Sequence, residues 1–177
     1  ARQGDAAVVV FPRPGHDGVA VPALARLDAA SGAEAPLPLT QAGLAGAAAP
    51  LMGQPYGWGG LYGNRDCSAT LQDLFTPFGI ELPRNSRDQI EAGPAVDLSG
   101  LDREAKLARI REAGVAWRTL LYTPGHILLY LGERGGEPVA LHTMWGVKTR
   151  GPWGREGRRV VGATVITTLS PGTQLDR

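Results

Sequence analysis

Three side chains of this 177-residue protein could together carry out nucleophilic catalysis: the single cysteine and two of the three histidines. Cys67 lies where a glycine-rich segment, residues 55–63, meets a stretch whose apolar residues recur at helical spacing. This pattern predicts that Cys67 lies in the first turn of a helix, where unpaired backbone N–H groups and the helix dipole favour a thiolate. A small buried side chain without a catalytic role is the alternative for a lone cysteine.

The two histidines, His126 and His142, fall in segments that we expect to form neighbouring antiparallel strands. If Tyr130 pairs with Pro138, facing residue numbers keep a constant sum, and the two histidines lie directly opposite each other on one face. A slip of one residue would place them on opposite faces. The third histidine, His16, lies among turn-forming residues, and we expect it to be solvated.

A thiol, an imidazole that accepts its proton and a second ring that orients this imidazole form a nucleophile, a base and an orienting group. Cys67, His126 and His142 could supply these three parts. A zinc ion held by the same three residues is an alternative, although a single cysteine excludes a site built mainly from thiolates.

The elements that must position these side chains follow from turn chemistry and hydrophobic periodicity. Helices are expected at 41–52, from 67 to about 78 and at 86–91, and a further helix is expected to follow the capping signal of Ser99 and Asp102 and to end at about 113. Strands are expected at 117–122, 126–131, 139–145 and 160–169. Helices followed by antiparallel strands indicate an α+β fold. Strands expected at 7–11 and 18–22 cannot stand alone, so residues 1–39 must pack on another part of the protein or end a small barrel that begins upstream.

Composition narrows the class of protein further. Hydrophobic residues make up 43% of the chain, too many for a disordered protein, and no run is long and apolar enough to span a bilayer. The net charge of +1 argues against a nucleic-acid partner, which would call for a basic surface. With 25 glycines and 14 prolines, the chain is typical of a turn-rich globular protein.

Five sequence blocks occur in a fixed order: PYGWGG, DCSATLQDLF, LPRNSRDQ, PGHILLYLG and ALHTMWG. Over residues 41–169 this order resembles the NlpC-type peptidoglycan cysteine peptidases, papain-like enzymes of the bacterial cell envelope. The resemblance implies a papain-like α+β fold over residues 40–177, with N-terminal helices packed on an antiparallel β-sheet. Residues 1–39 resemble the closing part of the bacterial SH3-like barrel that often precedes this domain.

The resemblance also implies a role for each residue of the catalytic set. Cys67 matches the nucleophile, His126 the general base that later acts as an acid, and His142 the third member. Tyr56 matches a tyrosine beside the nucleophile that helps to hold the oxyanion, for which the backbone N–H of Cys67 is the other expected donor.

Residues that match the pocket for the stem peptide in relatives with a barrel are Trp58, Asp66, Ser68 and Ser86. In those relatives the aspartate receives the free amine of the terminal L-Ala. Each residue also has a purely structural interpretation: packing for the tryptophan, a local turn for the aspartate and a helix cap for either serine.

The implied activity is hydrolysis of the γ-D-glutamyl–diamino acid bond in stem peptides such as L-Ala-γ-D-Glu-diaminopimelate, through an acyl-enzyme and without metal or cofactor. The alternatives are an N-acetylmuramoyl-L-alanine-type amidase and a non-catalytic peptidoglycan-binding module. We expect a monomer, located in the periplasm or secreted.

Two segments depart from the minimal family pattern. An insertion at residues 92–116 is expected to shape one wall of the substrate groove. Residues 148–159 are locally basic, and we expect a solvated loop there; a contact with the carboxylates of the stem peptide is the alternative.

Overall fold

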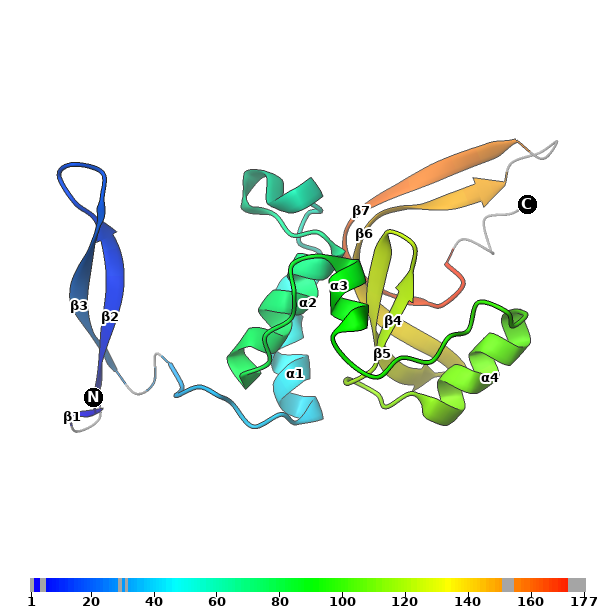
Figure 1. The fold of residues 1–177 in the computed structure, drawn as a ribbon, viewed down its shortest axis with the longest axis horizontal. Coiled ribbons are helices and arrows are strands. Elements are labelled where there is room, and N and C mark those ends of the chain that lie inside the picture. Colours follow the sequence, from blue (N-terminus) through cyan, green and yellow to red (C-terminus); the bar gives the residue numbers. More distant parts are fainter. Residues whose placement is uncertain (1, 4–5, 29, 31, 151–154, 172–177) are drawn as a thin grey trace. The chain divides into compact units, whose positions relative to one another are not determined.

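A computed structural model describes residues 2–3, 6–28, 30, 32–150 and 155–171 and divides the chain into two compact units, Ala1–Leu37 and Pro38–Arg177. The first unit is an antiparallel sheet of β1 (Arg2–Gln3), β2 (Ala6–Pro14) and β3 (Ala20–Asp28), in that order (Figure 1). Strand β3 begins and ends later than the sequence predicts, because it pairs with β2 along nine residues. That residues 1–39 belong to an SH3-like barrel stays a prediction.

The second unit contains helices first and an antiparallel sheet second, so the α+β prediction is confirmed. Its α-helices are α1 (Gln41–Ala48), α2 (Cys67–Phe75), α3 (Ser86–Glu91) and α4 (Arg103–Ala113). Short 3-10 helices are η2 (Ala49–Leu51), η3 (Trp58–Gly63) and η4 (Thr76–Phe78). The strands are β4 (Leu120–Thr123), β5 (His126–Arg134), β6 (Glu137–Arg150) and β7 (Glu156–Thr168), in the order β4-β5-β6-β7.

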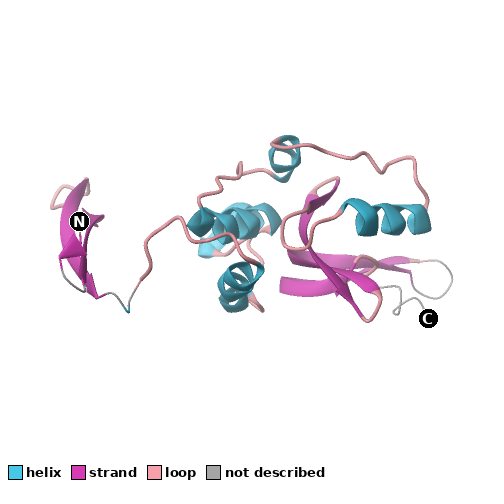
Figure 2. Cartoon of the chain, turned by 90° about the horizontal axis from the view of Figure 1, so that it is seen from below, coloured by secondary structure: helices cyan, strands magenta, loops and turns pink. Residues whose placement is uncertain are grey.

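Helices α1 and α4 begin where a side chain accepts a hydrogen bond from a free N–H group of the first turn. Thr40 caps α1 by accepting from the N–H of Gly43, and Asp102 caps α4 by accepting from the N–H of Ala105. Pro50 lies in η2, so the α-helix ends before it, as the sequence predicts. Figure 2 shows α4 lying beside the four-stranded sheet.

The hairpin of β5 and β6 has a different register from the one expected. Tyr130 pairs with Ala140 instead of Pro138, and Gly132 pairs with Val139, so Leu131 is an extra residue on β5. The turn is also tighter, because only Gly135 and Gly136 separate the two strands. The bulge and the two-residue turn together move the register by two residues near the histidines, and an even shift keeps every side chain on its expected face.

The expected strand at 117–122 is shorter at its start, since Trp117 has a φ of 66° and lies in a turn. The expected solvated loop at 148–159 is wrong for most of its residues. Lys148 pairs with Arg158 and Val147 with Arg159, because β6 and β7 continue as a ladder well beyond Trp145. Residues 151–154 of that expected loop lie outside the described residues.

Helix α2 packs on β5 and β6, where it forms the core of the unit. The side chains that meet there are fully buried: Leu71 and Leu74 from the helix, and Ile127, Leu129 and Leu141 from the sheet. Among the described residues, no helix has the length and apolar character needed to cross a membrane.

Candidate active site

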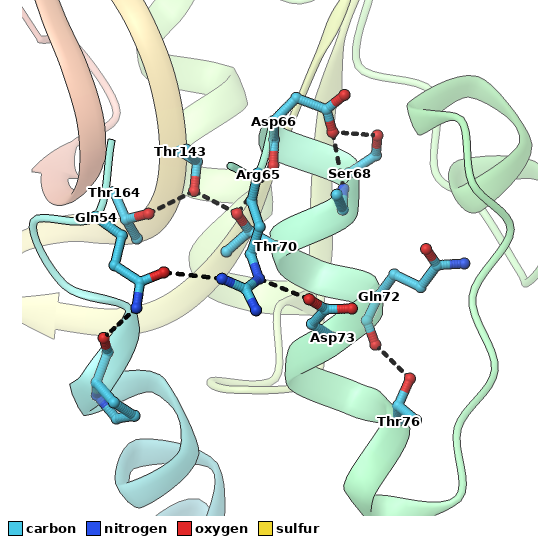
Figure 3. Close-up of polar contacts among 12 residues, drawn as sticks. Gln54, Arg65, Asp66, Ser68, Thr70, Gln72, Asp73, Thr76, Thr143 and Thr164 are labelled. Carbon is cyan, nitrogen blue, oxygen red and sulfur yellow. Dashed lines mark hydrogen bonds and ion pairs between the residues drawn. The ribbon is translucent and has the colours of Figure 1, made fainter. Parts of the chain in front are cut away.

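Helix α2 presents the cysteine at its N-terminus. Asp66 is the N-cap, and its carboxylate accepts a hydrogen bond of 2.9 Å from the N–H of Ala69, so Cys67 is the first helical residue. Ser68 donates to the same carboxylate oxygen over 3.1 Å (Figure 3). The predicted position of the thiol at the start of a helix is thus confirmed. Cys67 and Ser68 are both buried, at 6% and 5% exposed.

The surroundings of the sulfur oppose ionisation in the free protein. Burial raises the pKa of the Cys67 thiol, the N–H of Ile127 lowers it, and the neighbouring Asp66 carboxylate raises it again. The backbone N–H groups of Ser68 and of Cys67 itself also lower it, but the net pKa is raised. The resting group is therefore a thiol, whereas the helix position alone led us to expect a thiolate.

The two histidines meet on one face of the sheet. His126 Nε2 lies 2.7 Å from His142 Nδ1, with the ring centroids 5.0 Å apart. The observed register, continued from Leu129–Leu141, puts Leu128 opposite His142, so the histidines are diagonal rather than direct neighbours. Aromatic side chains reach each other at a diagonal position, and the contact survives the wrong register for that reason.

Both imidazoles are held neutral by burial. His142 is 1% exposed, and burial together with the nearby His126 lowers its pKa to about 3. Burial also lowers the pKa of the half-buried His126 below its ordinary value. A neutral His126 can accept a proton, as a general base must.

Both chain neighbours of His126 lie beside the cysteine. Gly125 lines the same hollow as Cys67, and the N–H of Ile127 points at the sulfur. Within the described part of the chain, no hydrogen bond joins the sulfur to the imidazole. Catalytic contacts of this kind are often long in a free enzyme and tighten when the substrate binds.

The hollow around the cysteine has a volume of about 430 Å³ and includes every residue predicted to contact substrate. It is lined by Tyr56, Trp58, Gly59, Asp66, Cys67, Ser68, Arg84, Asn85, Ser86 and Gly125. Tyr56 is held there by its backbone N–H, which donates to Gly162 of β7 over 2.8 Å. Gly57 follows it at a close approach, since a Cβ atom there would lie 2.6 Å from Asn64.

Tyr56 remains a hydrogen-bond donor at any physiological pH. Burial raises its pKa to about 12, and the neighbouring Cys67 and Asp66 act in the same direction. Its ring stacks edge-on against Trp58, with centroids 5.1 Å apart, and Trp145 lies about equally close to both. Trp58 is nonetheless 60% exposed, which leaves one side of the indole open to the hollow.

Comparison with known proteins assigns the chain to a family. Residues 53–149, more than half of the chain, match the NlpC/P60 family. The chain belongs to this family. NlpC/P60 proteins are cysteine peptidases that hydrolyse peptidoglycan, so the resemblance seen in the sequence is confirmed at the level of the family.

Two relatives extend this assignment. An NlpC/P60 endopeptidase from Photobacterium damselae subsp. piscicida has a solved structure that is 28% identical, with a TM-score of 0.79 over 95% of this chain and 40% of that one. The γ-D-glutamyl-L-lysine dipeptidyl-peptidase of Bacillus subtilis is 39% identical over 51 residues, 28% of this chain and 17% of that protein. The chain thus spans less than half the length of either relative.

Arg84 is the residue of the NlpC/P60 site that the sequence analysis missed. Its guanidinium forms a bidentate ion pair with the Asp66 carboxylate, with N···O distances of 3.0 Å and 2.7 Å, and also donates to the Ser68 hydroxyl over 3.0 Å. Burial acts to raise the pKa of Asp66, but the hydrogen bonds from Arg84 and from the N–H of Ala69 outweigh it, and the net pKa is lowered. A buried carboxylate needs a cationic partner, and the first of the two arginines in the LPRNSRDQ block was the available signal.

The structural interpretations of the pocket residues can now be compared with their positions. Ser68 and Ser86 are not caps, because Asp66 and Asn85 occupy the N-cap positions of α2 and α3. Asp66 is the N-cap of α2 and also lines the hollow, and its contact with substrate stays a prediction.

The zinc alternative does not fit the geometry of this site, and the wall that residues 92–116 were expected to form does not belong to the cysteine hollow. Zinc cannot lie between the histidines, since 2.7 Å between their facing nitrogens is a hydrogen-bond distance, and two nitrogens on one tetrahedral zinc lie more than about 3 Å apart. The insertion at 92–116 contributes no residue to the lining of the cysteine hollow. It lines a second, larger hollow of about 980 Å³ against β4 instead, because α4 packs beside the sheet and away from the start of α2.

Proposed function

We propose that this chain is a cysteine endopeptidase that hydrolyses the bond between the γ-carboxyl of D-glutamate and the following diamino acid in peptidoglycan stem peptides. The observation that carries the proposal is the cysteine at the start of α2, in a hollow with a tyrosine donor. The residues on either side of His126 contact this hollow and the sulfur, and His126 is hydrogen-bonded to His142. The name of the Bacillus subtilis relative specifies a γ-D-glutamyl bond to a diamino acid, which supports the choice of bond.

The proposed reaction begins with a proton transfer from Cys67 to His126 as the sulfur attacks the γ-carbonyl carbon. The carbonyl oxygen becomes an oxyanion that accepts hydrogen bonds from the N–H of Cys67 and the hydroxyl of Tyr56. The C–N bond then breaks, and His126 gives its proton to the departing amine. Water attacks the thioester with His126 as base, which releases the glutamyl acid and restores the thiol.

Asp66 is proposed to receive the free amine of the terminal L-Ala. Its Oδ1 atom already accepts from Ala69, Ser68 and Arg84, whereas Oδ2 accepts from Arg84 alone. A carboxylate oxygen has room for a second donor, so an ammonium group can join at Oδ2 without displacing the arginine. Acetylation of the peptide's N-terminus is expected to raise KM with this enzyme.

Peptidoglycan as partner and the cell envelope as location follow from the same proposal. A monomeric state and a barrel-derived origin of residues 1–39 are separate proposals that rest on the sequence alone. The proposed reaction requires no metal or organic cofactor, because the thiol, the imidazole and the oxyanion donors all come from the chain.

The decisive experiment incubates the protein with L-Ala-γ-D-Glu-L-Lys and with its diaminopimelate counterpart and follows the products by mass spectrometry. The wild-type protein is expected to release L-Ala-D-Glu, and Cys67→Ala is expected to release none while retaining the wild-type circular dichroism spectrum. Equal turnover by Cys67→Ala would refute the assignment. Separation of the intact stem peptide from N-acetylmuramic acid in a muropeptide would indicate the amidase, and binding without any cleavage would indicate a binding module.

A further inference from the structure

The hydrogen bonds of the histidine pair continue to a third strand. His142 Nε2 lies 3.0 Å from the hydroxyl oxygen of Thr167 on β7, and that hydroxyl donates to the carbonyl of Thr168 over 2.8 Å. Thr167 pairs with Ala140, and Val165 pairs with His142. Thr167 is two residues from Val165, so its side chain lies on the same face of the sheet as that of His142. A row of polar groups thus runs from β5 through β6 to β7.

The direction of every bond in this row is fixed from one end. A carbonyl oxygen only accepts, so the Thr167 hydroxyl uses its single hydrogen on Thr168 and must accept from His142. His142 therefore carries its proton on Nε2. Its Nδ1 is bare and accepts from His126 Nε2–H, which leaves His126 Nδ1 bare.

We propose that Thr167 is a positioning residue that sets the tautomers of both histidines and so leaves His126 Nδ1 free to take the proton of Cys67. This inference rests on the proposed function, since it assigns a task to the same nucleophile and base. Nothing else in the row can do this, because an isolated pair of neutral imidazoles can share its hydrogen bond in either direction. With the bond reversed, His126 would carry its proton on Nδ1 and could not act as the base toward the thiol.

Neutral rings are the condition for this argument, because a charged imidazole donates from both nitrogens. Burial lowers the pKa of both histidines, that of His142 to about 3. Among the described residues, His126 is the only titratable group that contributes to the pKa shift of His142. Each ring therefore has one N–H group at neutral pH, and the hydroxyl at the end of the row decides which nitrogen carries it.

The test compares Thr167→Val, which keeps the shape and removes the hydroxyl, with Thr167→Ser, which keeps the hydroxyl. The valine variant is expected to lower kcat/KM for the tripeptide about 10- to 100-fold, the factor that corresponds to one hydrogen bond of a buried polar group. The serine variant is expected to stay within about threefold of the wild type. Equal losses in both variants would point to methyl packing and overturn the proposal.

A spectroscopic measurement tests the tautomers without any substrate. Long-range ¹H–¹⁵N correlation spectra of histidine-labelled protein distinguish Nδ1–H from Nε2–H. The wild-type protein is expected to show Nε2–H for both His126 and His142, and Thr167→Val is expected to depopulate this form. Nδ1–H on His142 in the wild type would overturn the proposal, even if the valine variant failed to fold.

Thr164→Val is the matched control, because it also removes a buried β7 hydroxyl but one that does not contact a histidine. It is expected to keep the wild-type tautomers. The rate of Cys67 alkylation by iodoacetamide gives a second readout, expected to fall in Thr167→Val and to recover in Thr167→Ser. If the tripeptide is not cleaved at all, the proposed function fails, while the spectra and the alkylation rates still decide the role of Thr167.

Discussion

At the scale of single residues, the site depends on one cation that neutralises an acidic cap. Asp66 is 9% exposed and has Arg84 as its ion-pair partner, while the arginine itself is 41% exposed in its side chain. The aspartate thereby serves the helix, through Ala69, and the hollow, through Oδ2. Removing the arginine would leave a largely buried carboxylate without its strongest donors.

Arg84→Gln is therefore expected to lower the free energy of unfolding at pH 7 by about 1 kcal/mol, a modest value because solvent screens the exposed guanidinium. The Asp66 pKa is lowered in the folded protein, so the pair stabilises it above the ordinary pKa of 3.8 and loses its effect as the pH falls below that value. Urea unfolding followed by tryptophan fluorescence measures both effects.

The control for this measurement is Arg87→Gln, which breaks the solvent-exposed ion pair between Arg87 and Glu91. It is expected to leave the urea midpoint unchanged. A midpoint shift in Arg87→Gln as large as in Arg84→Gln would show that charge balance, and not the Asp66 contact, accounts for the loss.

At the scale of elements, hydrogen bonds between buried hydroxyls link the first turn of α2 to strands β6 and β7. Thr70 donates to the carbonyl of Asp66, so it must accept from Thr143 on β6, which in turn accepts from Thr164 on β7 (Figure 3). All three side chains are at most 1% exposed. Because Thr143 directly follows His142, these hydrogen bonds connect the helix that carries Cys67 to His142.

The direction of these bonds predicts unequal costs for two valine substitutions. Thr143→Val leaves the Thr164 hydroxyl as a buried donor without an acceptor, and we expect a loss of about 1–3 kcal/mol in the free energy of unfolding. Thr164→Val removes only the last donor, and we expect about 1 kcal/mol. Urea unfolding of both variants and of the double variant measures the difference.

In the double variant the orphaned donor is absent, so its loss is expected not to exceed that of Thr143→Val by more than a few tenths of a kcal/mol. Additive losses would mean that the two hydroxyls do not interact. A larger loss in Thr164→Val than in Thr143→Val would reverse the assigned direction of the chain.

At the scale of the whole molecule, the buried histidine ties stability to pH. The His142 pKa is lowered to about 3, whereas an unfolded histidine titrates near 6.5. Between these values the unfolded chain binds a proton that the folded protein does not, so stability falls as the pH is lowered through this range. The neutral ring's contribution to stability is complete above about pH 7. Below that pH the free energy of unfolding falls by at most about 1.4 kcal/mol per pH unit from this group.

His142→Asn is expected to flatten the fall in stability between pH 6.5 and pH 4, because asparagine has no proton to gain. All four tryptophans lie in the second unit, so their fluorescence during urea unfolding reports on this unit alone. His16→Asn, in the first unit, is the control and should leave the slope unchanged. An unaltered slope in His142→Asn would contradict the burial of a neutral ring at this position.

The sequence alone determined the features that depend on neighbours along the chain. Helical spacing and the glycine-rich segment before it predicted the thiol at the start of α2, because both signals are local in the chain. Alternation placed His126 and His142 on strands and on one face, and parity preserved that result when the register moved by two residues. The order of the sequence blocks identified the family.

Only the tertiary structure decided the features that join residues far apart in the chain. The bulge at Leu131 set the register, because a ladder is chosen by all of its pairs together and local turn residues allow several alternatives. Asp66 meets Arg84, and His142 meets Thr167, across 18 and 25 residues of chain, and no local pattern states which polar groups will meet. Burial, which reverses the expected ionisation of Cys67, exists only once the chain has packed.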